Sequence, residues 1–237
     1  MIQGKVLIDG DIVAYRAAFS TQDKFPKDAI AKCDELMDYI LGKTLIFARP
    51  DEYEVFLTGG NNFRFEIAKS APYKGNRKGE KPVHLPLVRD HMVNKWGATV
   101  SDGEEADDLI GIAATKYGPD TVVASIDKDM LQIPCRHFNF VRNEWVDVSE
   151  LEGTKFFYKQ ILTGDSADNI IGLHGIGPKK AATLIDELNT EEEMWDCVVK
   201  MYDGDVDRVV ENARLLWLRR KEGEIWEQPE ARKQKAG

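Results

Sequence analysis

The sequence contains few of the residues that build disulfide frameworks and zinc sites. Only three cysteines and four histidines occur among 237 residues, and both kinds are scattered along the chain. An odd number of dispersed cysteines is typical of a reducing compartment and argues against a disulfide framework. The same scatter argues against a zinc site, which needs closely spaced Cys and His ligands.

Long apolar runs and net positive charge are also lacking. No run reaches membrane-spanning length, and the first eleven residues lack the layout of a signal peptide, so we expect a soluble, cytoplasmic protein with no membrane partner. The 32 Lys and Arg against 41 Asp and Glu give a net charge of −9. This balance excludes a uniformly basic nucleic-acid binder, although a local basic patch remains compatible with it.

The amino-acid composition is that of a chain that can bury a hydrophobic core. Hydrophobic residues make up 43% and charged residues 31%, which excludes disorder throughout. The length suggests one large domain, or one domain with a small appendage. We expect a core over residues 1–150 that includes a loop at 59–83, a helical region at 151–226, and a polar tail at 227–237.

Apolar patterning predicts strands that alternate with helices, which is typical of an α/β fold with a mainly parallel sheet. From residue 150 onward the pattern is almost wholly helical. Residues 59–83 show Gly and Pro but no sustained periodicity, which indicates a long functional loop. The other expected elements are strands at 6–8, 54–57, 98–100 and 121–126, helices at 12–20, 26–49, 85–96 and 104–117, and a hairpin at 137–148.

Acidic residues gather where the predicted strands end and where helices begin. Ligands of parallel sheets bind at the carboxyl ends of the strands, so these acids are candidates for a shared site. The candidates are Asp9 and Asp11 after the first strand, Glu104, Glu105, Asp107 and Asp108 at a helix start, Asp127 and Asp129 after the fourth strand, and Asp165 and Asp168 further on.

Two interpretations of these acids stay open. Acids at helix N-termini are ordinary caps, which explains Glu104 and Glu105 taken alone and serves Asp127 equally well. Taken together, however, converging carboxylates repel one another unless cations neutralise them. Magnesium and manganese prefer such oxygen ligands, and two of these ions suit phosphoryl transfer.

Two further segments suggest phosphate binding. Gly-Ile-Gly-Pro-Lys-Lys, residues 175–180, opens a helix whose backbone amides and two lysines would suit an anion, unless it is a plain helix connection. The loop from Arg64 to Lys81 carries six basic and two acidic residues, a local charge of +4, interleaved with aromatic rings. That pattern suits a flexible strand or an unpaired nucleic-acid end, and equally a solvated loop.

Together these motifs resemble the phage-type 5′-to-3′ exonucleases, relatives of the flap endonucleases and of the 5′-nuclease domain of bacterial DNA polymerase I. Each motif is weak alone, but the ordered set is specific and covers most of the chain. The matching segments are LIDGD at 7–11, FRFEIAKSAPYKGNRK at 63–78, EEADD at 104–108, ASIDKDMLQI at 124–133 and GDSADNIIGLHGIGPKKAA at 164–182.

The resemblance implies a PIN-like nuclease core followed by a helix-three-turn-helix element, at about residues 165–188, that grips duplex DNA and commonly holds a potassium ion. It implies Mg²⁺ or Mn²⁺ as cofactor, and Lys74 and Arg77 as a basic pair near the scissile phosphate. The implied metal ligands are Asp9, Glu105, Asp107 and Asp108 in a first cluster and Asp127, Asp129, Asp165 and Asp168 in a second. The implied DNA contacts are Arg64, Lys69, Tyr73, Lys78, Gly175, Gly177, Lys179 and Lys180.

One position departs from the family pattern. The family usually has an aspartate after the second strand, where this chain has Thr58-Gly59-Gly60. A carboxylate is therefore missing near the first metal unless Asp11 or a water takes its place. The segment from Lys74 to Glu104 is also short for a long helical arch, which predicts rudimentary threading of 5′ flaps.

We therefore predict metal-dependent hydrolysis of phosphodiesters near DNA 5′ ends, in duplexes, nicks or flaps, and also in the RNA primers of RNA–DNA hybrids. We expect a monomer, in the host cytoplasm if a phage encodes it. A haloacid-dehalogenase-like phosphatase with Asp9 as nucleophile is an alternative, but it leaves most of the acids and the Gly-Ile-Gly-Pro-Lys-Lys segment without a role. A DNA-binding homologue with a weakened nuclease core is the other alternative.

Overall fold

The computed structural model describes residues 4–44 and 52–229, which form two compact units. The sheet unit consists of the described residues within 1–62, 79–148 and 220–222. The helical unit consists of those within 63–78, 149–219 and 223–237. Residues 63–78, which the sequence analysis groups with the nuclease core, thus cluster with the helical unit. The end of the helix predicted at 26–49 and most of the predicted tail lie outside the described residues.

The sheet unit is built on a six-stranded sheet in the order β3-β2-β1-β4-β5-β6. All neighbouring pairs are parallel except β5 and β6, which form the predicted hairpin. The strands are β1 (Val6–Asp9), β2 (Tyr53–Leu57), β3 (Thr99–Val100), β4 (Val122–Ala124), β5 (Arg136–Asn139) and β6 (Glu144–Asp147). The predicted α/β class with a mainly parallel sheet is confirmed.

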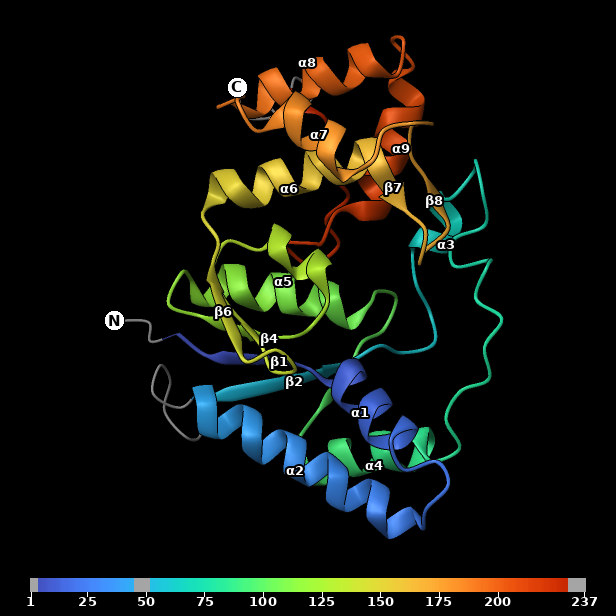
Figure 1. Ribbon diagram of the computed structural model, residues 1–237, viewed down its shortest axis with the longest axis vertical. Coiled ribbons are helices and arrows are strands. Elements are labelled where there is room, and N and C mark those ends of the chain that lie inside the picture. The colour runs from blue at the N-terminus through green and yellow to red at the C-terminus, as the bar shows by residue number, and fades with distance from the viewer. Residues whose placement is uncertain (1–3, 45–51, 230–237) are drawn as a thin grey trace. The chain divides into compact units, whose positions relative to one another are not determined.

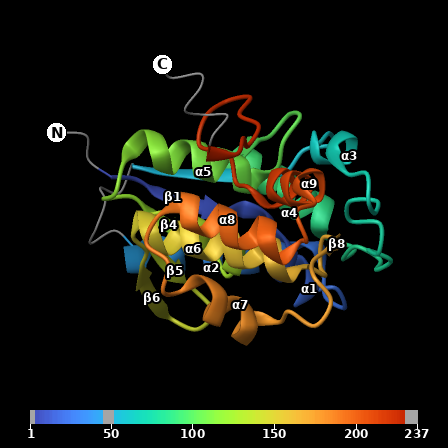
Figure 2. The same cartoon turned by 90° about the horizontal axis from the view of Figure 1, so that it is seen from above.

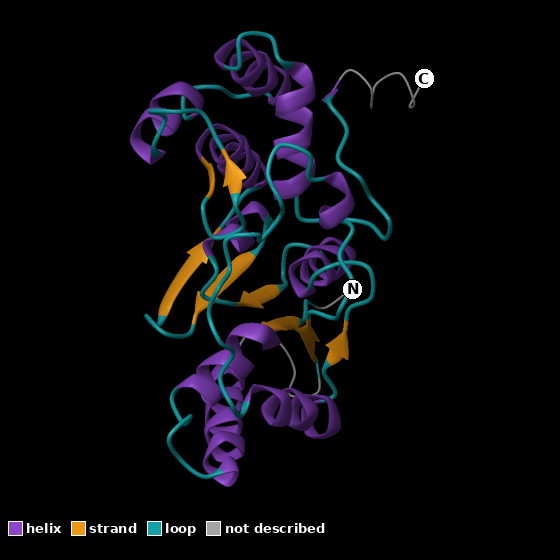
Figure 3. Ribbon diagram, turned by 90° about the vertical axis from the view of Figure 1, so that its right-hand side faces the viewer, coloured by secondary structure: helices purple, strands orange, loops and turns teal. Residues whose placement is uncertain are grey.

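Helices cover both faces of this sheet (Figure 1, Figure 3). One face packs on α1 (Gly10–Phe19), α2 (Pro26–Thr44) and α4 (Leu85–Trp96), and the other on α5 (Ala106–Tyr117). Central strands such as Val6–Asp9 are buried throughout, because a parallel sheet between two helical layers has no solvent face. The 3-10 turn η1 (Lys128–Gln132) follows β4.

The helical unit packs its helices around an aromatic core. Phe157, Tyr158 and Trp195 belong to one buried cluster with aliphatic residues of several helices. Figure 2 shows α8 lying across α6, and the two helices are in contact. The elements are α3 (Arg64–Ile67), α6 (Glu150–Thr163), β7 (Gly164–Asp165), β8 (Ile170–Ile171), α7 (Pro178–Ile185), α8 (Glu191–Met201) and α9 (Val206–Leu216).

Two local features differ from the sequence predictions. The segment expected to be a long loop contains the short helix α3, and the region expected to be almost wholly helical contains the β7–β8 hairpin. Gly164 allows this hairpin, since its φ is +68° and a Cβ there would lie 2.3 Å from the nitrogen of Gly172. No helix among the described residues is long and apolar enough to span a membrane.

Candidate metal and nucleic-acid site

Asp9 lies at the carboxyl end of β1 and caps the helix that follows. Its Oδ1 accepts a hydrogen bond from the Ile12 amide at 3.1 Å, and its Oδ2 accepts one from the Ser125 hydroxyl at 2.6 Å. The residue is only 2% exposed. Both carboxylate oxygens are thus held by donors of the protein, which fixes the side chain at the sheet edge.

Ser125 joins this aspartate to the acids that follow β4. Its hydroxyl oxygen accepts a hydrogen bond from the Asp127 amide at 3.0 Å while the hydroxyl donates to Asp9. Asp127 in turn caps η1, because its Oδ1 accepts from the Asp129 amide at 2.9 Å. Ser125 was not among the site residues predicted from the sequence. The available signal was a hydroxyl residue two positions before an acid at a strand end.

The acids at the start of α5 form a reciprocal capping box. Glu105 is the N-cap and accepts from the backbone of Asp108, whose Oδ2 accepts from the Glu105 amide at 3.1 Å. The capping interpretation therefore holds for Glu105, with Asp108 as its partner. It does not extend to Asp107 in the same turn, whose side chain takes no part in the capping box.

Burial and mutual repulsion raise the pKa of two of these carboxyls. Burial raises the pKa of Asp9 to about 7, and the charges of Asp11 and Asp127 add to the effect. Loss of hydration also raises the pKa of Asp107 well above its usual range, and the charges of Asp9, Glu105, Asp127 and Asp108 push it further in the same direction. The carboxylates of β1, α5 and β4 are therefore close enough to interact.

This donor set fits a hard divalent cation. The side chains supply only oxygen atoms, and a cation among them would relieve the repulsion that raises the two pKa values. Within residues 4–44 and 52–229, however, no three His, Cys, Asp or Glu side chains are arranged to hold a metal ion as they stand. The individual metal ligands stay predictions.

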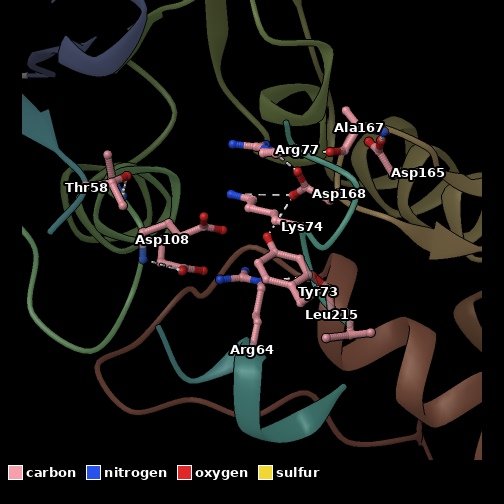
Figure 4. A network of polar contacts seen from close by, with 12 residues as sticks. Thr58, Arg64, Tyr73, Lys74, Arg77, Asp108, Asp165, Ala167, Asp168 and Leu215 are labelled. Atoms are coloured by element: carbon pink, nitrogen blue, oxygen red, sulfur yellow. Dashed lines mark hydrogen bonds and ion pairs between the residues drawn. The ribbon is translucent and has the colours of Figure 1, made fainter. Parts of the chain in front are cut away.

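The second pair of predicted ligands, Asp165 and Asp168, lies in the helical unit. Asp165 is 6% exposed, and its Oδ1 accepts from the Ala167 amide at 2.7 Å. Asp168 is surrounded by donors from the loop before α4: Tyr73 donates its hydroxyl to Oδ2 at 2.7 Å and Arg77 binds Oδ1 at 2.5 Å (Figure 4). Lys74 Nζ lies 3.7 Å from the same carboxylate.

Lys74 and Arg77, predicted to act near a scissile phosphate, therefore lie together on one carboxylate. Arg77 is the more accessible, with 57% of its side chain exposed against 20% for Lys74. The φ of +54° at Lys74 is unusual for a residue with a side chain, and its amide donates to the Asp168 carbonyl at 2.8 Å. Asp168 thus holds the backbone of Lys74 and pairs with the charged groups of both residues.

Two predicted DNA contacts do not fit the structure. Arg64 is 1% exposed, and its guanidinium donates to the carbonyls of Leu215 and Trp217, each at 2.8 Å. Because these carbonyls end α9 and have no helical partner, Arg64 caps that helix and anchors α3 to it. Tyr73 is 4% exposed and packs into the core of the helical unit, so its ring is not available as a stacking platform.

The remaining predicted DNA contacts of the helical unit are accessible. Lys69 and Lys78 are exposed in the loop, whose start is held by Glu211 through the amides of Lys69 and Ser70. Gly175 has a φ of +76°, and Gly177 is the N-cap of α7. Lys179 and Lys180 are exposed in the first turn of that helix.

The raised pKa of Asp9 predicts that metal-free protein loses stability as the pH rises. A carboxyl whose pKa moves from 3.8 to about 7 on folding binds an extra proton in the folded state between those values. This stabilises the fold at low pH, and the stabilisation is lost as the pH rises through that window, by on the order of a few kcal/mol. Asp9→Asn should remove it.

Urea unfolding in the presence of a chelator checks this prediction across the same pH window. The parent-minus-variant difference in free energy of unfolding should fall as the pH rises. The exposed Asp120, substituted by Asn, is the control and should show no such trend. A constant or rising difference for Asp9→Asn would contradict the assignment.

Comparison with known proteins supports the resemblance inferred from the motifs. The chain is 30% identical to the 5′-3′ exonuclease of Mycoplasma genitalium over 80% of this chain and 74% of that protein. It is 28% identical to DNA polymerase I of Chloroflexus aurantiacus over 89% of this chain, but it spans only 25% of that polymerase. It is 26% identical to the flap endonuclease Xni of Shewanella baltica over 62% of this chain and 63% of that protein.

The fold also matches solved structures. The D15 protein of bacteriophage T5, crystallised with metal ions, superimposes with a TM-score of 0.65 over 90% of this chain and 88% of that one, at 17% identity. The predicted resemblance and the predicted enzyme class, a nuclease, are confirmed. The model of the 5′-3′ exonuclease N-terminal resolvase-like domain matches residues 5–160, which is more than half of this chain, so the chain belongs to the 5′-3′ exonuclease family.

Proposed function

We propose that this protein is a divalent-metal-dependent 5′-to-3′ exonuclease and flap endonuclease that hydrolyses phosphodiesters near DNA 5′ ends. The observation that carries the proposal is the set of interacting carboxylates at the carboxyl end of the sheet: the charge of Asp127 helps to raise the pKa of Asp9, and the charges of Asp9 and Asp127 help to raise the pKa of Asp107. In a chain of this family, such an arrangement has a direct use in binding the cations of a nuclease.

Magnesium or manganese is the cofactor that this donor set favours. Bound divalent ions would neutralise the phosphate and activate water for attack on it. The protein's own contribution is to hold the carboxylates: Ser125 orients Asp9, and the capping box orients Glu105 and Asp108. The residues we assign to the ions are Asp9, Glu105, Asp107, Asp108, Asp127, Asp129, Asp165 and Asp168.

DNA with a 5′ end is the proposed substrate, in a duplex, at a nick or on a flap, and RNA primers in RNA–DNA hybrids are proposed as well. A structure of the bacteriophage T5 D15 flap endonuclease was solved as a complex with DNA and metal ions, which supports DNA as the substrate. We also propose that the protein acts as a monomer.

The segment at about residues 165–188 is proposed to be the helix-three-turn-helix element that holds duplex DNA, and its turns are proposed to bind K⁺. Its support in this chain is electrostatic. Two lysines lie in the first turn of α7, at the positive end of the helix dipole, where cations are unfavourable, and this turn contains no acidic residue. A phosphate bound there would compensate this charge.

The phosphatase alternative is not favoured. A haloacid-dehalogenase-like site needs its last acidic motif after a strand of the main sheet. In this chain Asp165 instead belongs to a separate two-stranded antiparallel sheet in the helical unit. The family match over residues 5–160 also gives that alternative no support.

Removing one carboxylate after β4 should separate cleavage from binding. We expect Asp129→Ala to abolish release of nucleotides from a 5′-labelled duplex in Mg²⁺, since it deletes a proposed ion ligand. DNA affinity, measured by fluorescence anisotropy in Ca²⁺, should change little because binding rests on basic residues. Asp120→Ala, an exposed acid before the same strand, is the control and should cleave like the parent.

Retained cleavage by Asp129→Ala with lost binding would overturn the assignment of this residue. Labelled protein from a phosphate donor would instead indicate the phosphatase. A parent that holds the duplex in Mg²⁺ without cutting it would indicate a binding homologue.

Lys74 and Arg77 should affect turnover more than affinity. Each is placed by Asp168, and a cation aimed at the scissile phosphate helps most where negative charge develops in the transition state. Single-turnover cleavage with saturating enzyme removes the binding step from the measured rate. We expect Lys74→Ala and Arg77→Ala each to lower that rate by on the order of 10²–10³.

The matched control for this pair is Lys78→Ala, because Lys78 is an exposed cation of the same loop. It should keep a near-parental single-turnover rate. If Lys74→Ala and Arg77→Ala both cleave at the parental rate, their role is limited to docking.

Lys179 and Lys180 should contribute to binding of duplex DNA regardless of its sequence. Each phosphate contact releases a counterion, so losing one lowers the slope of log affinity against log salt by about one. We expect Lys179→Ala with Lys180→Ala to weaken binding and lower the slope by about two. Lys32→Ala removes a lysine paired with Glu35 and should leave the slope unchanged. A parental slope in the double variant would remove α7 from the DNA interface.

A further inference from the structure

Thr58, which occupies the position where the family usually has an aspartate, is a polar junction. Its amide donates to Asp11 Oδ2 at 2.9 Å, and its carbonyl accepts from Arg89 Nη2 at 2.6 Å. Its hydroxyl oxygen accepts from the amide of Ala106, the first residue of α5, at 3.0 Å. One residue at the end of β2 thus joins α1, α4 and α5.

Asp11 and Arg89 complete this junction. Arg89 Nη1 forms an ion pair with Asp11 Oδ1, so one guanidinium binds the Asp11 carboxylate and the Thr58 carbonyl at once. Both Asp11 oxygens are therefore occupied by protein donors. One of these donors is the Arg89 cation, so the charge of Asp11 is already offset, whereas the donors to Asp9 are an uncharged amide and hydroxyl.

The chain next to Thr58 is also fixed in place. The Gly59 amide donates to the Ser101 hydroxyl at 3.0 Å, and that hydroxyl donates to the Glu104 carbonyl at 2.5 Å. A Cβ at Gly59 would lie 2.0 Å from the Ser101 carbonyl oxygen, so only glycine fits this approach. The end of β2 and the acidic first turn of α5 are thus tied together.

The charge of Asp11 reaches the proposed metal ligands. Asp11 lies in the first turn of α1, two residues after Asp9, which is the N-cap of the same helix. Arg89 offsets that charge through its ion pair, and the two side chains are only 27% and 32% exposed, so solvent screens the pair incompletely. The net charge felt by a cation at Asp9 therefore depends on whether the pair is intact.

We propose that Arg89 is a positioning residue that sets the metal affinity of this site in place of the family's aspartate. It neutralises Asp11, withholds its carboxylate from the ions, and holds the Thr58 carbonyl so that α5 presents its acids in register. This inference rests on the proposed function, because it concerns the same cations. The effect of the Arg89 charge is predicted for the binding of the ions, which can be measured without DNA cleavage.

The test measures Mn²⁺ binding by calorimetry without DNA. Arg89→Met should tighten the Kd by on the order of three- to tenfold, because the Asp11 charge is no longer offset. Asp11→Asn should weaken it by a similar factor, because Arg89 is left unbalanced. The double variant should return to within about twofold of the parent, because the two charges leave together.

Two further variants separate charge from geometry. Arg89→Lys keeps the charge but cannot bind both Asp11 and Thr58 as a fork, so it should keep the parental Kd while single-turnover cleavage slows. Arg136→Met breaks another Arg–carboxylate pair of the sheet unit, with Asp147, and should change neither property.

If Arg89 had a structural role alone, its loss would lower the melting temperature, but the Mn²⁺ Kd would not tighten in Arg89→Met and weaken in Asp11→Asn. An unchanged or weaker Mn²⁺ Kd in folded Arg89→Met, with the parent binding Mn²⁺ and cleaving DNA, overturns this inference alone. If Arg89→Met does not fold, an unchanged Kd in Asp11→Asn overturns it equally. A parent that neither binds Mn²⁺ nor cleaves overturns the proposed function as well.

Discussion

Repulsion between carboxylates is the constraint that the rest of this structure accommodates. The fold brings acids from β1, α5 and β4 to one sheet edge, where burial and like charge make ionisation costly. Several of these side chains are nevertheless held by local donors, such as the Ile12 amide for Asp9 and the Asp129 amide for Asp127. The caps keep the acids in place at a cost in stability that a bound cation would remove, so the stability of the fold and the chemistry of the site are coupled.

Sequence patterns predicted those helices and strands whose ends depend on neighbouring residues in the chain. The helix at Leu85–Trp96 was predicted with its bounds, because Pro86 lies in its first turn and Gly97 ends it in a left-handed conformation. The ends of the strands, and the acids that lie there, were predicted because the apolar runs stop abruptly in the sequence. The same reasoning could not place Arg64, since the carbonyls that hold it lie about 150 residues away. A basic residue in a basic loop carries no local sign that it is buried.

Asp168 shows why residue types alone do not assign roles in such a site. The motif GDSADN was interpreted as ion ligands and the motif YKGNR as phosphate contacts. In the structure, however, Lys74 and Arg77 of the second motif both pair with Asp168 of the first. A carboxylate can be neutralised by protein cations or by a metal ion, and a lysine by a carboxylate or a phosphate. Lys74 and Arg77 therefore compete with a metal ion for Asp168, and Asp168 competes with phosphate for Lys74 and Arg77. The spacing of residues within either motif could not have predicted this contact between the motifs.

The departure at Thr58 extends this reasoning to the first set of acids. A missing carboxylate would ordinarily lower the negative charge of a cation site, and Asp11 lies nearby to restore it. The structure instead pairs Asp11 with Arg89, so the pair adds little net charge while its hydrogen bonds to Thr58 tie α1 and α4 to the end of β2. The Thr58 hydroxyl binds the start of α5. The elements around Thr58 are therefore held in place although the negative charge of the family's aspartate is absent. In a site whose acids already repel one another, fixing the positions of the remaining ligands costs less than adding another negative charge among them.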